Sequence, residues 1–437
     1  MTHEPTYFGL IRRKGFSAFL ATQFLGAMND NLLKYTTIFL AGAGMLSGAS
    51  GNNGQDVATI SFWAILPSLF FTSVAGYLAD NFEKRKVLIA TKAWEIGVML
   101  LAWLALRSGS FHAQLAVLFL LATQFTFFGP AKYGSVPELV GDGELSRANG
   151  LLEMSTFLAI LLGSVLAAPL FKRFSLHLDV IAGVMLAVAV LGSLVSLAIG
   201  PTPRPRQRVP FRASLFWSEV VEGTRTLYGD RRLWLTNLGA TYFWFQAALV
   251  QMTMVVMGQQ LLRLDQTGIT YLFMALALGI GGGSMMAGRW SGQKVELGLV
   301  PLGSLGMGVF ALALALNARS HPGLVIPALV GIGFSAGLFV VPLNALLQQK
   351  AEAGSKGRIQ AAANFFSTLG LILASLVLTV LSKWGLPTDR IMLLAGLGCF
   401  AMTTYLVALL PEFLVRFSLW LATHSVYSIK IKGQEHV

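Results

Sequence analysis

Charged residues are scarce in this chain. Asp, Glu, Lys and Arg make up 12% of its 437 residues, whereas about a quarter is usual for a soluble domain. Hydrophobic residues make up 55%, and they come in runs of about 20 residues, the length of a helix that crosses a bilayer. The scarcity of charge therefore argues against an ordinary soluble enzyme and predicts a polytopic membrane protein.

Cysteine and paired histidines are also scarce. The single cysteine, Cys399, lies in an apolar run, so a disulfide framework is excluded. The six histidines fall in expected loops, ends or tails, and no two have metal-ligand spacing on one helix face. The sequence therefore predicts no metal site, no cofactor and no catalytic residue.

Positive charge exceeds negative charge, with a formal net charge of +12. Such an excess can indicate nucleic-acid binding in a soluble protein. In a membrane protein it reflects cytoplasmic loops that face anionic lipid. We therefore expect membrane lipids, and no nucleic acid, among the partners.

Twelve apolar segments are long enough to span a membrane, and an even number places both termini on one side. Most loop Lys and Arg residues lie on the side of the N-terminus, which the positive-inside rule makes cytoplasmic. We expect an all-α membrane protein with both termini in the cytoplasm. The expected spans are 16–45, 57–80, 86–106, 112–136, 144–171, 177–200, 233–261, 268–288, 296–317, 322–346, 358–383 and 389–411.

A basic, proline-rich segment divides the chain. It begins with PTPRPRQRVP, where proline prevents a helix. Apolar residues at near-helical spacing follow, separated by Arg and Glu, and predict an amphipathic helix on the membrane surface. The expected units are an N-terminal six-helix bundle (1–200), a cytoplasmic linker (201–232), a C-terminal six-helix bundle (233–411) and a cytoplasmic tail (412–437).

The two halves of the chain resemble each other. When 127–150 is laid on 338–364, Pro130 matches Pro342 and Arg147 matches Arg358. A repeat of half the chain length is typical of transporters that hold their site between two bundles. We therefore expect two six-helix bundles that rock against each other.

The loop after the second expected span contains GYLADNFEKRKV, in which Gly76 and Asp80 precede Lys84, Arg85 and Lys86. It resembles the loop 2–3 signature of the major facilitator superfamily. Gly76 is expected to permit close helix packing, and Asp80 to bind a helix N-terminus of the opposite half. The basic residues are expected to face carboxylates and helix C-termini.

The resemblance implies that this loop network holds the outward-open state. The usual second glycine of the signature is absent. The segment GRWSGQKVE, between the eighth and ninth spans, is interpreted as a degenerate second copy. The simpler alternative is a short cytoplasmic loop that is basic without any latching role.

Four further stretches are more specific: QFLGAMNDN, GPAKYGSVPEL, RANGLLEMSTFLAILLGSV and LFVVPLNALLQ. Together they resemble the bacterial lysophospholipid transporter family, over about residues 16–411. The resemblance implies movement of lysophospholipids, chiefly lysophosphatidylethanolamine, from the outer to the inner leaflet of the bacterial inner membrane. The implied partners are the lysophospholipid, a coupling cation (Na⁺ or H⁺) if transport is coupled, and an acyltransferase or acyl-carrier-protein synthetase, fused or separate.

The residues after Glu412 resemble the lead-in to a glycerophospholipid acyltransferase domain, which some relatives carry fused to the transporter. The His-x4-Asp signature of that enzyme is missing, because Ile429 stands where the Asp would follow His424. We interpret the chain as the transporter part of a fusion. An ordinary juxtamembrane tail is the alternative.

The first expected span carries a polar centre, AMNDNLLKY. A charge at bilayer depth costs about 2.5–3.5 kcal/mol and usually faces a bundle interior or a cavity. Asp30 lies about 21 Å along the helix, and Lys34 is close enough to pair with it. Either the two neutralise each other, or Asp30 binds a cation or a lipid ammonium while Asn29 and Asn31 supply hydrogen bonds.

Gly129 and Pro130 are expected to interrupt the fourth span just before Lys132. A break frees backbone groups that can serve a ligand where they line a cavity. Lys132 is expected either to bind a lipid phosphate or to form a salt bridge between the bundles. Glu138, which follows in the same stretch, is assigned to the gate.

Other acidic and basic residues are assigned to structure or gating. Glu95 lies within one turn of Lys92, so a local pair is expected. Glu153 has no obvious local partner and is assigned to gating. Arg147 and Arg358, the matched arginines of the two halves, are assigned to the same role.

The seventh to twelfth expected spans contain no carboxylate deep in the membrane. They contain only amides, such as Gln246 and Gln251, and a group of aromatic residues. Gln251 is assigned to the substrate site. This imbalance suits an amphiphile, whose headgroup would bind near Asp30 in the first half while its acyl chain lies against apolar helices of the second.

Two other functions stay open. One is a cation-coupled exporter of drugs or metabolites, although the fifth span lacks a dense glycine-proline motif. The other is a non-transporting membrane module that docks an acyltransferase, although a pure anchor has no need of a charged centre in its first helix.

Overall fold

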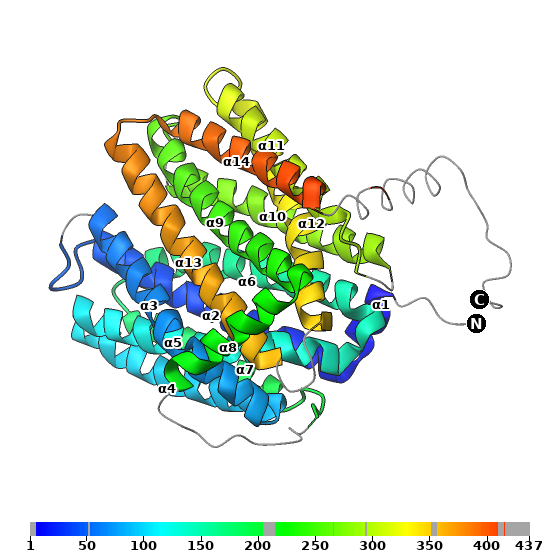
Figure 1. Cartoon of the computed structure of the whole chain (residues 1–437). Helices are drawn as coiled ribbons and strands as arrows, with labels where there is room; N and C mark the ends of the chain where they lie inside the picture. The colour runs from blue at the N-terminus through cyan, green and yellow to red at the C-terminus, as the bar shows by residue number, and fades with distance from the viewer. Residues whose placement is uncertain are drawn as a thin grey trace.

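The computed structural model describes residues 6–50, 53–203, 215–264, 266–292, 295–350, 356–409 and 415. These residues form α-helices, two short 3-10 turns and no strand (Figure 1). The helices are α1 (Tyr7–Arg12), α2 (Lys14–Gly42), α3 (Asn53–Asn81), α4 (Lys84–Ser108), α5 (Phe111–Val140), α6 (Leu145–Phe174), α7 (Leu178–Ser196), α8 (Leu215–Gly229), α9 (Arg231–Gln260), α10 (Gln266–Ser291), α11 (Leu299–Asn317), α12 (Val325–Lys350), α13 (Lys356–Lys383) and α14 (Thr388–Leu409).

Helices α2–α7 and α9–α14 match the twelve expected spans. Eleven of them are long and apolar enough to cross a membrane. The twelfth, α2, has 29 residues, but its polar centre lowers its hydropathy. Helix α8 coincides with the expected amphipathic helix of the linker. The first part of that linker (204–214), and the tail after Glu412 apart from residue 415, lie outside the described residues.

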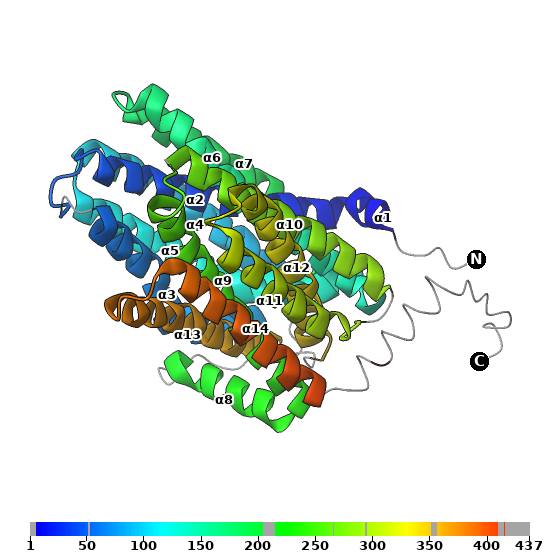
Figure 2. The same ribbon diagram turned by 90° about the horizontal axis from the view of Figure 1, so that it is seen from above.

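The helices form two bundles. In Figure 1, α2–α7 lie in the lower part of the view and α9–α14 in the upper part. Figure 2, turned by 90°, shows that α1 and the end of α14 lie at the same end of the molecule. The matched prolines and arginines of the repeat fall on corresponding helices: Pro130 on α5 and Pro342 on α12, Arg147 on α6 and Arg358 on α13.

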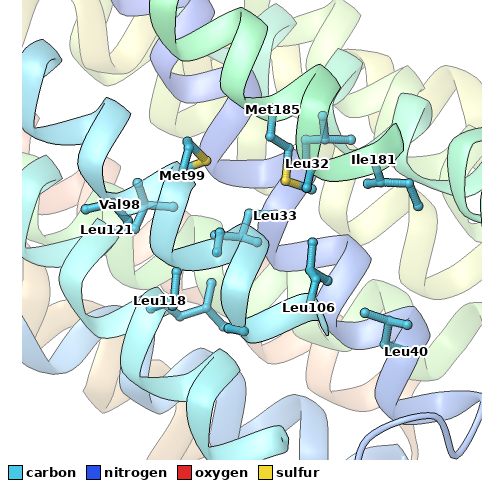
Figure 3. Packing of buried hydrophobic residues seen from close by; sticks show 14 of the residues in the cluster. Leu32, Leu33, Leu40, Val98, Met99, Leu106, Leu118, Leu121, Ile181 and Met185 are labelled. Carbon is cyan, nitrogen blue, oxygen red and sulfur yellow. The ribbon is translucent and has the colours of Figure 1, made fainter. Parts of the chain in front are cut away.

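Each bundle has its own apolar interior. In the first bundle, leucines of α2 pack against α4, α5 and α7 (Figure 3). In the second bundle, the glycines Gly279 and Gly283 of α10 face α12, where a Cβ on Gly283 would overlap the backbone of Phe334. Because lipid offers no hydrophobic drive for helix association, such close backbone packing is what holds membrane helices together.

One expectation about α5 is wrong. Gly129 and Pro130 do not interrupt the helix, which runs without a break over Phe111–Val140. A proline is tolerated inside a membrane helix when neighbouring groups satisfy the freed backbone carbonyl. Lys132 therefore does not sit beside an unwound segment.

Candidate transport site

The polar centre of α2 faces a buried ion pair on α4. Lys92 and Glu95 pair with each other, each with 1% of its side chain exposed. The Nδ2 of Asn29 donates a hydrogen bond to Oε1 of Glu95 at 3.1 Å. The expected pairing of Glu95 with Lys92 is confirmed, and Asn29 connects that pair to α2.

Two glycines make room for the buried lysine. A Cβ on Gly26 of α2 would lie 2.8 Å from Nζ of Lys92, and a Cβ on Gly192 of α7 would lie 3.1 Å from its Cε. The three helices therefore form a cradle around one ammonium group. A side chain larger than glycine at either position would therefore displace Lys92.

Of the two interpretations of Asp30, its neutralisation by Lys34 is not what the structure shows. Within the described part of the chain they form no ion pair, although they stand four residues apart on α2. Asp30 instead interacts electrostatically with Lys92 and Glu95 of α4. Its Oδ1 is buried and receives no hydrogen bond. Helical spacing brings Asp30 and Lys34 to neighbouring positions on α2, but the charged groups that interact with Asp30 come from α4.

Asn31 is occupied by its own helix. Its Nδ2 donates to the carbonyl oxygen of Ala27 at 2.8 Å, and its Cβ lies beside Gly163 of α6. Lys34, by contrast, has no hydrogen bond or ion pair among the described residues. The ammonium of Lys34 is therefore uncommitted near the middle of α2.

A second polar cluster joins the two bundles. Glu153 of α6 accepts hydrogen bonds from the hydroxyl of Tyr133 at 3.2 Å and from Nδ2 of Asn344 on α12 at 3.0 Å. Nζ of Lys132 lies 4.4 Å from the centre of the Tyr133 ring and interacts electrostatically with Glu153. No ion pair of Lys132 occurs in the described residues, so the expected salt bridge between bundles is not formed there.

Gln251 lies apart from these clusters. It is exposed on α9 and forms no hydrogen bond in the parts of the chain described above. Gln246, one turn before it, donates instead to the carbonyl oxygen of Ala395 at 2.9 Å inside the second bundle. The structure does not bring Gln251 to the polar centre of α2.

Polar contacts between the bundles gather at one end, which we call the latched end. It is the end at which α3, α5, α10 and α12 finish and α4, α6, α11 and α13 begin. Here Asp80 accepts hydrogen bonds from the backbone N–H groups of Gly357 at 2.6 Å and Arg358 at 2.8 Å. A carboxylate at a helix N-terminus is favoured by the helix dipole. Asp80 thus connects α3 to the start of α13, as expected.

Gly76 allows this contact. A Cβ at Gly76 would lie 2.6 Å from the Cβ of Ala361 and 3.0 Å from the carbonyl oxygen of Gly357. Only a glycine lets α3 approach α13 so closely. The expected packing role of Gly76 agrees with this geometry.

The basic residues after Asp80 divide into two kinds. Nζ of Lys84 pairs with Glu138 of α5 at 2.6 Å, and Arg85 donates to the carbonyl oxygen of Leu197 at the end of α7 at 2.8 Å. Lys86 has 71% of its side chain exposed and reaches only Glu83, at 3.6 Å. Lys84 and Arg85 therefore bind a carboxylate and a helix C-terminus as expected, whereas Lys86 does not join the latch.

The second copy of the loop signature makes a related contact. Gly288 and Gly292 stand where the first copy has Gly76 and Asp80. A Cβ on Gly288 would lie 2.9 Å from the Cα of Arg147, and Nη1 of Arg147 donates to the carbonyl oxygen of Gly292 at 3.3 Å. The second latch thus joins α10 to the start of α6 with a backbone oxygen in place of a carboxylate.

Helix α8 reinforces the first latch. The guanidinium of Arg358 pairs with Glu219 and Glu222 of α8, both at 2.7 Å. A Cβ on Gly223 would lie 2.7 Å from the carbonyl oxygen of Arg358, so α8 lies directly against α13. The linker helix therefore fixes the same arginine whose backbone binds Asp80.

The comparisons with known proteins agree with this architecture. The sequence profile described as Major Facilitator Superfamily matches residues 16–375. The chain belongs to the major facilitator superfamily. This major facilitator protein is thus a membrane transporter by family, with the two-bundle fold expected from its sequence.

Curated relatives match most of the chain. Lysophospholipid transporter LplT of Enterobacter sp. (strain 638) is 29% identical over 377 residues, which cover 86% of this chain and 90% of that protein. LplT of Yersinia enterocolitica is 28% identical over 377 residues, with 86% and 89% covered. Both pairings extend through both bundles.

Solved structures share the fold. The human organic anion transporter MFSD10 has a TM-score of 0.74 at 16% identity, covering 90% of this chain and 99% of that one. The major facilitator transporter FucP in the outward conformation has a TM-score of 0.69 at 13% identity, covering 89% and 96%. At such identities the likeness concerns the fold alone.

Several site residues of this transporter were missed by sequence reasoning. Tyr133, Asn149, Asn344 and Gln348 all lie inside the four stretches that carry the family resemblance, yet no local pattern shows what they contact. The second bundle therefore contributes the amides of Asn344 and Gln348 to the interface, in addition to the amides that the sequence already indicated there.

Proposed function

We propose that this transporter moves lysophospholipids across the bacterial inner membrane. The curated relatives named lysophospholipid transporter support this substrate class. The observation that carries the proposal is the pair of lysines, Lys34 of α2 and Lys132 of α5. Both lie within membrane-spanning helices, and neither forms an ion pair among the described residues.

An unpaired ammonium inside a membrane protein is costly and is kept where a ligand or an ion needs it. The phosphate of a lysophospholipid headgroup supplies a negative charge to Lys34, or a second one to Lys132, which already interacts with Glu153. Lysine binds phosphate as a point charge, without the planar geometry that arginine imposes. The proposal therefore places the phosphate near α2 and α5.

Other assigned residues complete the site. Asp30, with Asn29 and Asn31, binds the coupling cation or the ammonium of a lysophosphatidylethanolamine headgroup. The single acyl chain lies against the apolar helices of the second bundle, in which Gln251 of α9 is exposed and lies apart from the polar centre of α2. A lysolipid has one chain to place, so an apolar surface and one polar centre are sufficient.

The direction follows from the charge of the loops. The latched end carries Lys84, Arg85 and Lys86, and a basic end is cytoplasmic by the positive-inside rule. Closure at this end corresponds to a state that faces the outer leaflet. Rocking of the bundles then delivers the lipid to the inner leaflet, where an acyltransferase, fused or separate, reacylates it.

The test is flipping of labelled lysophosphatidylethanolamine in proteoliposomes. Lys34→Gln and Lys132→Gln are each expected to lower the initial rate about tenfold or more, because a charge-assisted hydrogen bond contributes about 1.5–3 kcal/mol. Lys86→Gln, on the exposed side of the same bundle, is the matched control and keeps the wild-type rate. Absence of flipping by the wild-type protein, or equal rates in all variants, would overturn the proposal.

A further inference from the structure

Each bundle is preceded by a shorter helix that lies outside it. A single residue separates α1 from α2, and a single residue separates α8 from α9. Both shorter helices therefore end at the latched end, where a membrane-spanning helix begins. In the internal repeat α2 corresponds to α9, so α1 corresponds to α8 in the same way. We call α1 and α8 the surface helices.

The two surface helices occupy equivalent places on the molecule. Tyr7 of α1 lies between α6 and α10: its hydroxyl donates to the carbonyl oxygen of Met285 on α10, and a Cβ on Gly150 of α6 would lie 3.5 Å from the hydroxyl oxygen. α8 contacts α13 and α3, the counterparts of α6 and α10 in the repeat. Figure 1 shows α8 in front of α13, and Figure 2 shows it on the outer side of that helix. Each surface helix thus covers one of the two seams along which the bundles meet.

The matched arginines of the two halves lie beside the surface helices. Arg358 at the start of α13 pairs with Glu219 and Glu222 of α8. Arg147 at the start of α6 interacts electrostatically with Tyr7. Glu219 and Glu222 are the only acidic residues of α8, so the negative charge of that helix is already committed to the protein.

The outer face of α8 is aromatic, apolar and basic. Trp217, Val221 and Arg225 follow one another at four-residue spacing and so lie on one face of the helix, and Tyr228 comes three residues later. Trp217 is 53% exposed and Tyr228 is 72% exposed. Tryptophan and tyrosine are enriched at the level of the lipid headgroups, because their rings are both apolar and polar. The outer face of α8 therefore has the composition of a helix that lies on a membrane surface.

Basic side chains accompany the exposed rings in both surface helices. Arg225 of α8 and the neighbouring Arg231 and Arg232 of α9 are exposed, and none of them forms an ion pair with any residue that the structure describes. On α1, Phe8 is exposed and the guanidinium carbon of Arg12 lies 4.1 Å from the centre of its ring. The guanidinium groups on α8 and α9 are therefore available to an anion from outside the protein.

The anion that fits these faces is the phosphate of an anionic phospholipid. Both surface helices lead directly into membrane-spanning helices, so their outer faces lie at the level of the headgroups. The planar guanidinium group of arginine matches a phosphate with two hydrogen bonds, while exposed aromatic and apolar side chains enter the boundary of the acyl chains. An anion free in solution would use the arginines and leave the rings in water.

We propose that the outer faces of α1 and α8 bind anionic phospholipids of the adjacent leaflet, and that this binding keeps the latched end closed. Each surface helix contacts both sides of a seam, so it keeps its place only while that seam is closed. Lipid that binds the helix in this place stabilises the closed state, and closure raises the affinity for the lipid by the same factor. The inference goes beyond the proposed function and does not depend on which substrate is carried.

Contact with lipid is tested on the full-length protein in vesicles of phosphatidylcholine, with and without phosphatidylglycerol. A fluorophore on Val221→Cys is expected to be quenched by lipids with brominated acyl chains, and more strongly when phosphatidylglycerol is present. Thr226→Cys is the matched control, because Thr226 is also exposed but lies about 140° further around α8. The native Cys399 is buried and takes up no label. Equal quenching at the two positions would overturn the proposed contact.

The effect on the latched end is tested with Ser284→Cys in the same vesicles. Ser284 of α10 is fully buried beside Gly150 of α6, so a water-soluble thiol reagent reaches the new cysteine only when the latched end opens. Phosphatidylglycerol is expected to lower the reaction rate about fivefold or more, the effect of one arginine at an anionic surface. The combined Arg225→Gln, Arg231→Gln, Arg232→Gln variant loses this response.

Arginines at the opposite end of the molecule provide the control for the change in charge. The Arg263→Gln, Arg390→Gln variant removes exposed arginines after α9 and at the start of α14, and it keeps the wild-type response to phosphatidylglycerol. Arg12→Gln on α1 weakens the response in part, because α8 still binds lipid. A wild-type rate that is the same with and without phosphatidylglycerol would overturn the proposal, as would an undiminished response in the triple variant.

Discussion

Asn149 of α6 and Gln348 of α12 exchange two hydrogen bonds across the boundary between the bundles. Nδ2 of Asn149 donates to Oε1 of Gln348 at 2.9 Å, and Nε2 of Gln348 donates to Oδ1 of Asn149 at 2.8 Å. Both side chains are buried. The hydrogen bonds between bundles that involve Asp80, Arg147, Glu153 and this amide pair all lie in the same latched half, so the amide pair reports directly on its closure.

Removing the amide pair is expected to open the latched end. Each buried hydrogen bond contributes about 0.5–1.5 kcal/mol, and an orphaned partner costs more. Each single variant, Asn149→Ala or Gln348→Ala, leaves the other amide buried without its partner. Each should therefore destabilise the closed state by more than half of the free energy that the double variant costs. The measurement is the reaction of a Ser284→Cys reporter with a water-soluble thiol reagent. Ser284 is fully buried at this interface, and the native Cys399 is buried as well.

A double-mutant cycle separates this pair from general destabilisation. Coupling between Asn149 and Gln348 is expected because they share both bonds. Additive effects on the Ser284→Cys reaction would contradict the account of this pair.

Asp80 is expected to bind the N-terminus of α13 through its negative charge as well as through its hydrogen-bond acceptors. Asp80→Ala removes two charge-assisted bonds, each contributing about 1.5–3 kcal/mol, and should raise Ser284→Cys reactivity at least tenfold. Asp80→Asn retains an acceptor and should fall between this variant and the wild type. Lys86→Gln is the matched control, since Lys86 is exposed. Equal reactivity of all three variants would show that the latch does not depend on Asp80.

A methyl group at Gly76 is expected to separate α3 from α13. Gly76→Ala places its Cβ against Ala361, and overpacking costs about 1–3 kcal/mol. Gly97→Ala on α4 is the control, because a Cβ there meets nothing within 4 Å. The thermal unfolding midpoint of purified protein should fall for the first variant and stay or rise for the second. The reverse order would contradict the close approach of α3 and α13.

The contact of Tyr7 on α1 with α10, which we call the α1 latch, is expected to be insensitive to pH near neutrality. The Tyr7 hydroxyl donates to the carbonyl oxygen of Met285 on α10, and burial raises the pKa of Tyr7 to about 12. The hydroxyl is therefore protonated below the ordinary tyrosine pKa of about 10. Its contribution is complete there and is lost as the pH rises through about 12.

The α1 latch is measured with the same Ser284→Cys reporter. Tyr7→Phe should raise its reactivity by a constant factor between about pH 6 and pH 9, below the titration range of tyrosine. A factor that changes over this range would contradict the assignment. Any pH dependence that persists in Tyr7→Phe then belongs to another group.

The sequence predicted the architecture well for a physical reason. Long apolar runs must become helices in lipid, where every backbone group has to be bonded internally. The amphipathic α8 and the contact of Asp80 with α13 were equally predictable, because a surface helix and a loop signature each leave a local pattern.

Tertiary contacts of the site could not be predicted in this way. Helical spacing allowed Asp30 to pair with Lys34 but could not show that α4 would bring Lys92 and Glu95 beside it. Asn149 and Gln348 stand 199 residues apart, so nothing near either one reveals the other. Tyr7 precedes the first span and carries no motif.

Some expectations failed because they used residue type alone. Lys86 of the basic cluster is mostly exposed and pairs only with the nearby Glu83, whereas its neighbours Lys84 and Arg85 contact other helices. Pro130 was expected to break α5, yet that helix is continuous over Phe111–Val140. In both cases the residue type alone did not show the contacts that the residue makes.

The central claim is that this transporter recognises a monoacyl lipid by its phosphate. The most direct measurement compares flipping of two labelled lipids with the same acyl chain, lysophosphatidylethanolamine and a monoacylglycerol that lacks phosphate, in one preparation of proteoliposomes. The account predicts rapid protein-dependent flipping of the lysophospholipid only, and loss of that difference in the Lys34→Gln, Lys132→Gln double variant. Equal protein-dependent rates for the two lipids in the wild type would contradict it.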